Sequence, residues 1–237
     1  MTSSGTIGND NLLGTPGDDS IFGANGNDTI IGQDGDDTIN GGGGNDVIIL
    51  SGGGNNTATG GSGNDLIIDG GGSSRLSGSS GDDFISGGSG NDTIYGGADL
   101  DQIYGDSGQD FLYGNADSDF ISGGIGNDYV NGNDGEDTLE GNEGKDTLIG
   151  GSGEDTLTGG QGADQFFYNL AVSDGSTDTI TDFESGIDEI KLGSSQNYTI
   201  SILDDGSNFI VTATNNNTAD SFDLLVSTAQ IVESDIV

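Results

Sequence analysis

The chain has 237 residues with 48 Gly and 30% hydrophobic residues, and 41 acidic against 3 basic residues give it a formal net charge of −38. This composition excludes a large conventional hydrophobic core, and the lack of Lys and Arg clusters excludes a nucleic-acid-binding surface. Because His and Cys are both absent, zinc hydrolysis, disulfides and nucleophilic catalysis by Ser-His or Cys-His pairs are excluded as well.

The N-terminus and the apolar runs of the chain carry no targeting or membrane signal. Residues 1–10 lack the basic and apolar regions of a cleaved signal peptide, and no apolar run approaches the ~18 residues that span a bilayer. We therefore expect no membrane span, and an export signal would have to lie elsewhere in the chain.

A nine-residue repeat begins at Gly5 and continues to Phe167. Five blocks run from Gly5 to Ile49 (GTIGNDNLL, GTPGDDSIF, GANGNDTII, GQDGDDTIN, GGGGNDVII), Leu50 is one extra residue, and 13 further blocks begin at Ser51. A fixed period of this kind predicts a repeat architecture in which each unit packs on its neighbours. The residue inserted at Leu50 must be absorbed as a bulge or a widened turn.

Three positions of the block are nearly constant. The sixth is Asp in 16 of the 18 blocks, the exceptions being Asn56 and Ser74, and the fourth is Gly in 16, the exceptions being Asp99 and Asp117. The eighth is apolar in all 18 blocks. Each block therefore contributes one inward side chain, and a row of these side chains is the core that the repeat can form.

The remaining letters of the block predict a turn followed by a short strand. Gly lets the backbone turn tightly at positive φ and leaves room for carbonyl oxygens to point at a common centre. The last three positions are rich in Thr, Ile, Val, Phe and Tyr, so we expect a strand whose middle residue faces inward and whose neighbours face outward. Because one turn and one strand cannot close on themselves, two blocks must form one coil, and stacked coils form two parallel sheets.

Disorder is the alternative for a Gly-rich, acidic chain. Self-repulsion by 41 acidic residues opposes compaction unless cations are bound, so we expect a disordered chain in their absence. An apolar residue in phase through 18 blocks favours a folded repeat that depends on bound cations.

The pattern GGxGxDxUx, written here as GGSGNDTIY, GGSGNDLII and GGSGEDTLT, resembles the RTX, or haemolysin-type, calcium-binding repeats. The resemblance covers residues 5–167. It implies an all-β fold, a parallel β-roll that is a two-sheet right-handed solenoid with two nonapeptides per coil. It further implies Ca²⁺ ions between GGxGxD turns on the same edge, held by the repeat Asp carboxylates and by backbone carbonyl oxygens.

The donor set agrees with this ion. Carboxylate and carbonyl oxygens without His or Cys form a hard site that suits Ca²⁺ over zinc or copper, and Gly-rich turns suit Ca²⁺ over the stricter octahedron of Mg²⁺. Successive blocks lie on alternate edges, so the expected metal ligands form two ladders. The odd-block ladder is Asp10, Asp28, Asp46, Asp65, Asp83, Asp101, Asp119, Asp137 and Asp155; the even-block ladder is Asp19, Asp37, Asp92, Asp110, Asp128, Asp146 and Asp164, interrupted by Asn56 and Ser74.

The ladders predict the number of ions. The resemblance implies one site in each gap of a ladder, and with eight gaps on each edge, setting aside the three gaps that touch Asn56 or Ser74 leaves about 13 bound Ca²⁺. That number cancels about 26 of the 38 negative charges, so calcium binding is the expected folding switch. Relaxed calcium geometry is expected beside Leu50, and Asp99 and Asp117 either add carboxylates to their sites or strain their turns.

The nine-residue period stops after Phe167, and residues 168–237 predict a small C-terminal β subdomain that caps the solenoid. Residues 177–192 look like the segment that follows the last repeat in many RTX proteins, and Asp178 and Asp182 are candidates to complete the final site. NYTISIL, NFIVTAT and SFDLLVS then predict strands separated by DDGS and NNNTAD turns.

The last five residues, ESDIV, resemble the type I secretion signal of RTX exoproteins, the alternative being a last capping strand. With the calcium repeats, this resemblance implies a secreted, extracellular protein that passes the type I secretion machinery unfolded at low cytosolic Ca²⁺ and folds at millimolar Ca²⁺ outside. The favoured function is calcium ion binding by a structural or interaction module.

Two rival functions remain. An enzyme is not expected, because the repeat accounts for the acidic residues; the alternative is the non-catalytic RTX region of a larger exoprotein such as a protease, lipase, haemolysin or polysaccharide-modifying enzyme. Two outward strips permit self-association or binding to a surface polymer, although cross-strand pairing is the favoured interpretation. The strips are Tyr95, Phe111, Tyr113 and Tyr129 on one sheet, and Ile31, Val47, Ile49, Leu66, Ile68 and Phe84 on the other.

Overall fold

The computed structural model describes residues 1–169, 176–193, 198–204, 209–215, 221–226 and 236. All regular structure in these residues is β, in 24 strands, which confirms the predicted all-β class. The same residues contain no helix with the length and apolarity that a membrane span requires.

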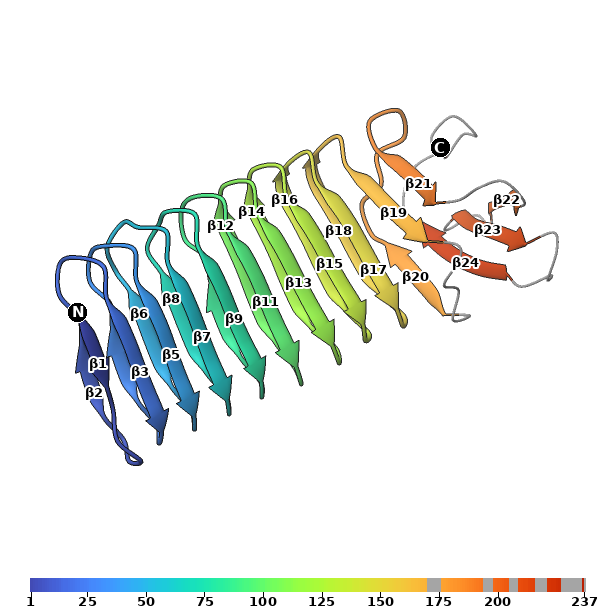
Figure 1. Cartoon of the computed structure of the whole chain (residues 1–237). Helices are drawn as coiled ribbons and strands as arrows, with labels where there is room; N and C mark the ends of the chain where they lie inside the picture. The colour runs from blue at the N-terminus through green and yellow to red at the C-terminus, as the bar shows by residue number, and fades with distance from the viewer. Residues whose placement is uncertain (170–175, 194–197, 205–208, 216–220, 227–235, 237) are drawn as a thin grey trace.

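The strands form two sheets that lie against each other along the whole repeat (Figure 1). Sheet A contains, in spatial order, β1 (Thr2–Ser4), β3 (Ser20–Asn25), β5 (Thr38–Gly43), β7 (Thr57–Ser62), β9 (Arg75–Ser80), β11 (Thr93–Ala98), β13 (Phe111–Ala116), β15 (Tyr129–Asp134), β17 (Thr147–Ser152), β19 (Gln165–Asn169) and β21 (Glu189–Gly193). Sheet B contains β2 (Asn11–Leu13), β4 (Thr29–Ile31), β6 (Val47–Leu50), β8 (Leu66–Asp69), β10 (Phe84–Ser86), β12 (Gln102–Ser107), β14 (Phe120–Ile125), β16 (Thr138–Gly144), β18 (Thr156–Gly162), β20 (Thr177–Ile180), β24 (Ser221–Val226), β23 (Phe209–Asn215) and β22 (Tyr198–Asp204).

Through the repeat, consecutive strands alternate between the sheets, and each strand pairs in parallel with the strand two places later in the chain. Ile94 of β11 pairs with Leu112 of β13, and Ile103 of β12 pairs with Ile121 of β14, so the coil repeats every 18 residues. Two nonapeptides therefore form one coil, and the chain is the expected parallel β-solenoid of about nine turns, visible in Figure 1 as a stack of flattened coils.

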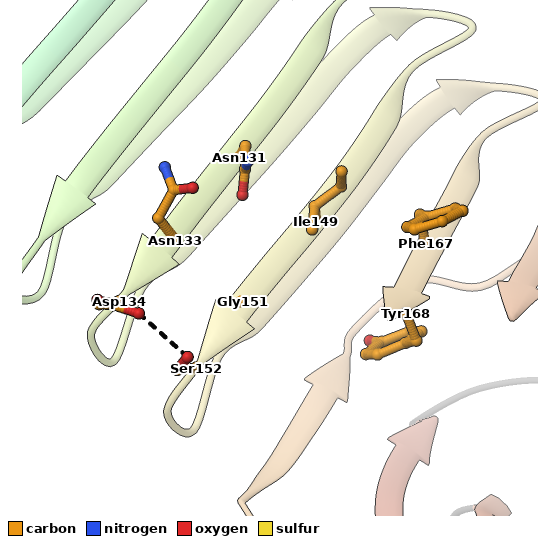
Figure 2. Close-up of a pocket in the computed structure, with 8 residues that line it drawn as sticks. All are labelled: Asn131, Asn133, Asp134, Ile149, Gly151, Ser152, Phe167 and Tyr168. Carbon is orange, nitrogen blue, oxygen red and sulfur yellow. Dashed lines mark hydrogen bonds between the residues drawn. The ribbon is translucent and has the colours of Figure 1, made fainter. Parts of the chain in front are cut away.

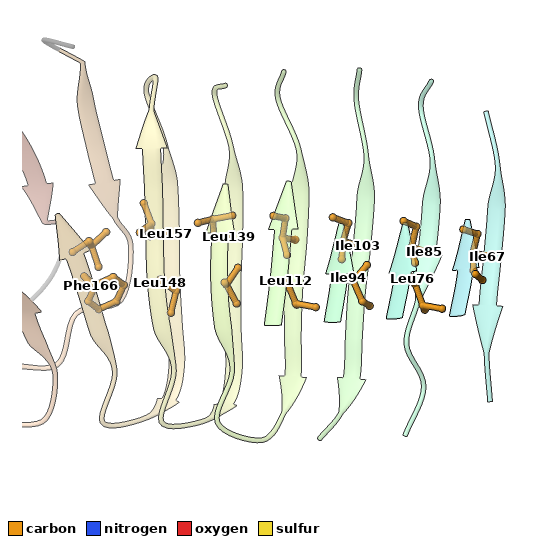
Figure 3. Close-up of a cluster of buried hydrophobic side chains, with 14 of the residues drawn as sticks. Ile67, Leu76, Ile85, Ile94, Ile103, Leu112, Leu139, Leu148, Leu157 and Phe166 are labelled. Atoms are coloured by element: carbon orange, nitrogen blue, oxygen red, sulfur yellow. The ribbon is translucent and has the colours of Figure 1, made fainter. Parts of the chain in front are cut away.

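The eighth residue of each block points into the space between the two sheets (Figure 3). All of these side chains except the half-buried Leu12 are buried, and one buried Ile or Leu stabilises a fold by about 1.5–3 kcal/mol. With one such side chain per nine residues, the core is thin. The buried members of the row are Ile21, Ile30, Ile39, Ile48, Ala58, Ile67, Leu76, Ile85, Ile94, Ile103, Leu112, Ile121, Val130, Leu139, Leu148, Leu157 and Phe166.

Many strands are longer than the three residues that the repeat predicts. β11, for example, runs from Thr93 to Ala98 and so includes the first three residues of the following block. These Gly-rich positions stay in the sheet because their backbone remains in register with the next coil, as Gly97 does with Asn115. The turn in such a block is confined to its fourth to sixth positions.

The extra residue of the repeat lies in a widened turn and not at Leu50. Leu50 extends β6, is fully buried, and pairs with Asp69 of β8, which is the first residue of its own block. Leu50 thus takes the first position of the block at 51–59, because burial of its apolar side chain keeps it in the strand. From Gly54 onward the residues again lie beside those of the same block position one coil later, as Gly54 lies beside Gly72. The expected widened turn is confirmed, and the site of the insertion is corrected to residues 51–53.

Residues beyond Phe167 continue both sheets without the nine-residue period. β20 pairs in parallel with β18, and β21 with β19, so both add to the stack. β24 pairs in parallel with β20, and β23 and β22 follow as antiparallel strands, which confirms the three strands predicted here. Residues 205–207 and 216–220 of the two predicted turns, and residues 233–235 and 237 of ESDIV, lie outside the described residues. Ile236 forms a parallel bridge with Ile190.

The outward aromatic side chains stack along the solenoid. On sheet A the rings of Tyr95 and Tyr113 lie 5.0 Å apart with an interplanar angle of 8°, and Tyr129 lies 5.7 Å from Tyr113. The Arg75 guanidinium caps this ladder 4.6 Å from the centre of the Tyr95 ring. The ring faces are used within the ladder, which confirms cross-strand pairing for this strip. A second ladder on sheet B consists of Phe84, Tyr104 and Phe120.

Candidate metal centre

The sixth residues of the blocks form a continuous hydrogen-bonded ladder on each edge of the solenoid. The backbone N–H of each residue donates to the side chain one coil later, as Asp92 does to Oδ1 of Asp110 at 2.7 Å and Asp101 to Oδ1 of Asp119 at 2.8 Å. The strand register produces this arrangement, because residues 18 apart lie directly above one another. The predicted ligands are thus brought together as two edge ladders, and all of them except the half-buried Asp10 are buried.

The second oxygen of most ladder carboxylates accepts no hydrogen bond. Oδ2 of Asp110, for example, is buried without a donor nearby. A buried carboxylate oxygen in this state is energetically costly unless another partner occupies the site, so it marks an open ligand position. The aspartates with such an Oδ2 are Asp28, Asp37, Asp46, Asp65, Asp83, Asp92, Asp101, Asp110, Asp119, Asp128, Asp137, Asp146 and Asp164.

The first Gly of the block keeps space open beside that oxygen. A Cβ on Gly105 would lie 2.6 Å from Oδ2 of Asp110 and 2.6 Å from the carbonyl oxygen of Gly123 one coil later. The same holds at Gly123, where Oδ2 of Asp128 would lie at 2.6 Å and the Gly141 carbonyl oxygen at 2.9 Å. A carboxylate oxygen and a carbonyl oxygen therefore converge on one point, and a side chain at the first position would fill it.

This donor set fits a hard divalent cation. Within the described residues no three acidic side chains gather around one point, so backbone carbonyl oxygens must complete any site that a rung begins. Ca²⁺ accepts six to eight oxygen ligands in irregular geometry, whereas Mg²⁺ requires a near-ideal octahedron and retains its waters. The residues present therefore fit Ca²⁺.

Burial raises the pKa of the ladder carboxyl groups because the charged form loses its solvation. The pKa of Asp110 rises to about 7; the hydrogen bond from the Asp92 backbone opposes this rise, and the nearby charges of Asp128, Asp92 and Asp106 add to it. Without a cation the packed turns therefore favour neutral carboxyl groups near neutral pH. The same cause raises the pKa to about 7 for Asp65, Asp83, Asp101, Asp119 and Asp146, and to about 6 for Asp92, Asp137 and Asp164.

A second ladder runs beside the first, through the fifth residues of the blocks, with the opposite direction of donation. The backbone N–H of Asn27 donates to Oδ1 of Asn9, one coil earlier, at 2.9 Å, and Asn45 donates to Oδ1 of Asn27 at 3.0 Å. These fifth residues are exposed, so they hold the turns at a fixed spacing from the solvent side. Neighbouring turns are therefore tied in both directions as far as Leu100 and Gln109, and again between Ser118 and Glu136 and between Asn127 and Lys145.

The first rung of each edge differs from the rest. Oδ2 of Asp10 accepts from the backbone N–H and the hydroxyl of Thr6 at 2.6 and 2.9 Å. Oδ2 of Asp19 accepts a hydrogen bond from the Thr15 hydroxyl at 3.1 Å, and its Oδ1 accepts one from the N-terminal ammonium of Met1. The hydrogen bond from this ammonium holds the pKa of Asp19 below its usual value. These two predicted ligands are already contacted by donors of the chain itself.

The ladders extend one rung beyond the repeat on each edge. The backbone N–H of Asp155 donates to Oδ1 of Asp178, and that of Asp164 donates to Oδ1 of Asp188, both at 3.0 Å. Asp178 and Asp188 are both buried. Asp178 was a sequence candidate, whereas Asp188 was missed because the nine-residue period had ended. The sequence nevertheless marks Asp188 as a rung, because an apolar residue follows two places later. IDEI at residues 187–190 and TDTI at residues 177–180 both keep the Asp-to-apolar spacing of the repeat.

The other sequence candidate for the final site, Asp182, lies outside the ladders. Its Oδ1 accepts from the backbone N–H of Gly159 at 2.9 Å, and its Oδ2 accepts from that of Gly160 at 2.8 Å. Asp182 therefore binds the backbone amides at the start of the last block and does not extend a rung.

Asp99 and Asp117, which replace the fourth Gly, adopt the left-handed conformation with φ of 74° and 70°. Asp tolerates this conformation better than most residues because its short side chain can bond to nearby backbone. Oδ2 of Asp99 accepts from the Gly81 backbone at 3.2 Å, and Oδ2 of Asp117 accepts from the Asp99 backbone at 3.3 Å. Both carboxylates thus tie one turn to the turn before it.

A groove of about 250 Å³ lies on the outer face of sheet A, away from both ladders (Figure 2). Asn131, Ile149 and Phe167 follow one another along it on neighbouring strands. Its carboxylate, Asp134, accepts a hydrogen bond from the Ser152 hydroxyl at 3.1 Å. This carboxylate oxygen has a donor, in contrast to Oδ2 of Asp110.

The repeat matches the sequence profile of the RTX calcium-binding nonapeptide repeat at residues 4–34, 22–53, 50–73, 68–103, 77–112, 95–130, 104–139 and 131–166, which together span about two thirds of the chain. No curated protein matches the chain significantly. The chain is similar to the AlgE6R3 subunit of the Azotobacter vinelandii mannuronan C5-epimerase, with 25% identity over 52% of this chain and 78% of that one and a TM-score of 0.39. It is also similar to the AlgE6R2 subunit of the same enzyme, with 24% identity over 61% of this chain and 91% of that one and a TM-score of 0.36.

Proposed function

The chain belongs to the RTX calcium-binding nonapeptide repeat family, and on this premise we propose that it is a secreted calcium-binding protein whose β-roll folds by taking up Ca²⁺ between stacked turns. The observation that supports this function best is the buried Oδ2 that accepts no hydrogen bond, beside the space that the first Gly leaves open, as at Asp110 and Gly105. The ion supplies the positive charge that the buried carboxylates need.

The proposed ligands are the 16 ladder aspartates of the repeat, joined by Asp178 and Asp188. Each site takes a carboxylate oxygen from the ladder and carbonyl oxygens from the turns on either side of one gap. The two added rungs contribute one gap on each edge, which raises the proposed number of ions from about 13 to about 15.

Calcium is also the proposed folding switch. The core has one buried side chain per block, and the formal net charge of −38 opposes compaction. About 15 Ca²⁺ would neutralise about 30 of these charges and offset the conformational entropy that so thin a core cannot offset alone. The chain therefore stays unfolded at low Ca²⁺ and forms the β-roll at high Ca²⁺.

The test is far-UV circular dichroism with a calcium titration. We expect a coil spectrum in excess EDTA, a β spectrum in millimolar Ca²⁺, and about 15 ions bound per chain at saturation. Mg²⁺ at the same concentration is the control and is expected to leave the chain unfolded. A β spectrum in excess EDTA, or fewer than about eight Ca²⁺ per chain, overturns the proposal.

Secretion is the second part of the proposal. The repeat family and the resemblance of ESDIV to a type I secretion signal support export by that machinery into the extracellular, calcium-rich medium. Export from a host with a type I secretion system tests it, with a chain that ends before Glu233 as the control. Equal export of both chains contradicts the role of the C-terminal residues.

We divide the chain into a calcium-binding β-roll at residues 5–167 and a C-terminal β cap at residues 168–237. The continuation of sheet B from β18 to β20 and β24 supports a capping role for these residues at the end of the stack. No catalytic role is proposed, since the ladders account for the buried aspartates other than Asp69; the chain acts as a structural or interaction module, alone or as the non-catalytic RTX region of a larger exoprotein. A screen for polysaccharide-modifying activity in millimolar Ca²⁺ tests this, and turnover would contradict it.

A further inference from the structure

The even edge holds two turns in which the ladder continues without its carboxylates. The backbone N–H of Asp37 donates to Oδ1 of Asn56 at 3.0 Å, that of Asn56 to Oγ of Ser74 at 3.0 Å, and that of Ser74 to Oδ1 of Asp92 at 2.7 Å. Asn and Ser thus preserve the hydrogen bond that ties one coil to the next. What these two rungs lack is the second carboxylate oxygen.

The second polar function of these rungs has the opposite polarity. Where the other rungs present an acceptor oxygen, Asn56 presents its Nδ2–H, which donates to Oδ1 of Asp69 at 3.0 Å. The hydroxyl of Ser74 likewise donates to Oδ2 of Asp69, and the Gly70 backbone N–H donates to Oδ1 at 2.8 Å. Donors that converge on one point bind an anion and disfavour a cation.

Asp69 is that anion. It occupies the first position of its block, where every other block except 51–59 has the Gly that leaves the cradle open, and it is only 3% exposed. Both of its carboxylate oxygens accept hydrogen bonds from donors of this edge, in contrast to Oδ2 of Asp110, which accepts none.

Leu50 fills the neighbouring gap in a different way. It takes the first position of the preceding block on this edge and is fully buried. Its Cδ2 would lie 3.1 Å from a Cβ on Gly32 one coil earlier, whereas a Cβ on Gly105 would meet the carbonyl oxygen of Gly123 in an intact turn. A methyl group therefore stands where the turn at Gly105 brings a carbonyl oxygen.

We propose that Asp69, Asn56, Ser74 and Leu50 form a calcium-free clamp that replaces metal ions on this edge. This inference rests on the proposed function, because it assumes that the intact gaps hold Ca²⁺. The clamp interrupts the even edge between Asp37 and Asp92 and joins its two calcium arrays with side-chain contacts of the protein.

The first test compares two buried carboxylates in the full chain. Asp69→Ala is expected to leave the number of bound Ca²⁺ unchanged and to lower the melting temperature of the calcium-loaded protein by about 5 °C, because the Asn56 amide and the Ser74 hydroxyl lose their acceptor. Asp110→Ala, the matched control, is expected to lose about one or two ions per chain. Loss of an ion from Asp69→Ala overturns the clamp and makes Asp69 a ligand.

The second test restores the repeat. The triple variant Asn56→Asp, Ser74→Asp, Asp69→Gly is expected to gain about one or two ions per chain. A folded triple variant with an unchanged number of ions overturns the clamp. Anomalous scattering from calcium-loaded crystals of the unmodified protein gives an independent result, since an ion between Asn56 and Ser74 also overturns it.

The two proposals fail in different ways. If the unmodified chain binds no calcium, both fall together, and Asp110→Ala then changes no ion count. If the unmodified chain binds calcium along its intact gaps and Asp69→Ala removes an ion, the clamp alone is wrong.

Discussion

The Asp92 backbone N–H donates to Oδ1 of Asp110 at 2.7 Å, while Oδ2 of Asp110 is buried without a hydrogen-bond donor. The two oxygens of one carboxylate therefore have different tasks. Oδ1 holds the coils in register, and Oδ2 remains available to a ligand. Asn56 supports this division, because it keeps the contact from Asp37 with its Oδ1 and replaces the second oxygen by a donor.

Replacing Asp110 by Asn separates these two tasks. The Asn side chain can keep the hydrogen bond from Asp92 but presents an N–H in place of Oδ2, so we expect Asp110→Asn to bind about one or two fewer Ca²⁺. The circular dichroism at saturating Ca²⁺ should match that of the unmodified chain, with the folding midpoint at a higher Ca²⁺ concentration. Asp134→Asn is the control, because Asp134 accepts from Ser152 in the outer groove; an equal loss of ions in both variants would contradict the assignment.

Acid should partly replace calcium. Burial raises the pKa of Asp65, Asp83 and Asp101 from 3.8 to about 7 in the calcium-free fold. The fold then binds more protons than the unfolded chain, so this stabilisation is fully present below about pH 4 and is lost as the pH rises through about 7.

The measurement is far-UV circular dichroism in EDTA between pH 8 and pH 4. We expect β signal to grow on acidification, and we expect calcium affinity to weaken over the same range because protons compete for the same oxygens. The control is the calcium-loaded protein at pH 8, which should already be folded. More β signal at pH 8 than at pH 4 in EDTA would contradict the linkage.

The sequence predicts the coil, the inward row and the 16 repeat aspartates because local preference and period point to the same arrangement at every block. It does not predict contacts that depend on which residues lie above one another. From the sequence, Leu50 is the extra residue of the repeat. In the structure Leu50 pairs with Asp69, so the insertion lies in the following turn. Asp188 has the spacing of a rung, but its place in the ladder depends on the path of the chain after the repeat.

Gly at the fourth position of the block is required by geometry at Gly108. Its φ is +151°, and a Cβ there would overlap the carbonyl oxygen of Gly90 one coil earlier. We expect Gly108→Ala to destabilise the calcium-loaded fold by at least about 2 kcal/mol, measured by urea unfolding in saturating Ca²⁺. Gly8→Ala is the control, because a Cβ on this fourth-position Gly meets no atom within 4 Å. Similar losses in both variants would mean that backbone overlap is not the cause.

The inward row should tolerate truncation poorly because each member is most of the core of its block. Ile94 is fully buried between Leu76 and Leu112 of the neighbouring coils. We expect Ile94→Ala to lower the free energy of unfolding by about 2–5 kcal/mol in saturating Ca²⁺. Ile125→Ala, at a side chain that is 57% exposed, should change it by less than about 0.5 kcal/mol. An Ile94 effect as small as that of Ile125 would show that the ions alone hold the coils together.

The tyrosine ladder on sheet A should stabilise the solenoid without serving as an association surface. Tyr113 lies between Tyr95, on which it stacks, and Tyr129, whose ring is tilted by 49° against it, so its ring already has two aromatic partners in the same chain. We expect Tyr113→Ser to lower stability by about 1–2 kcal/mol through the loss of both aromatic contacts. Its sedimentation coefficient in millimolar Ca²⁺ should equal that of the unmodified chain, with Ile125→Ala on sheet B as the control for a generic surface change. If the unmodified protein forms a calcium-dependent oligomer that Tyr113→Ser abolishes and Ile125→Ala does not, the strip is an association surface. The tyrosine rings would then form contacts between molecules in addition to those within one chain.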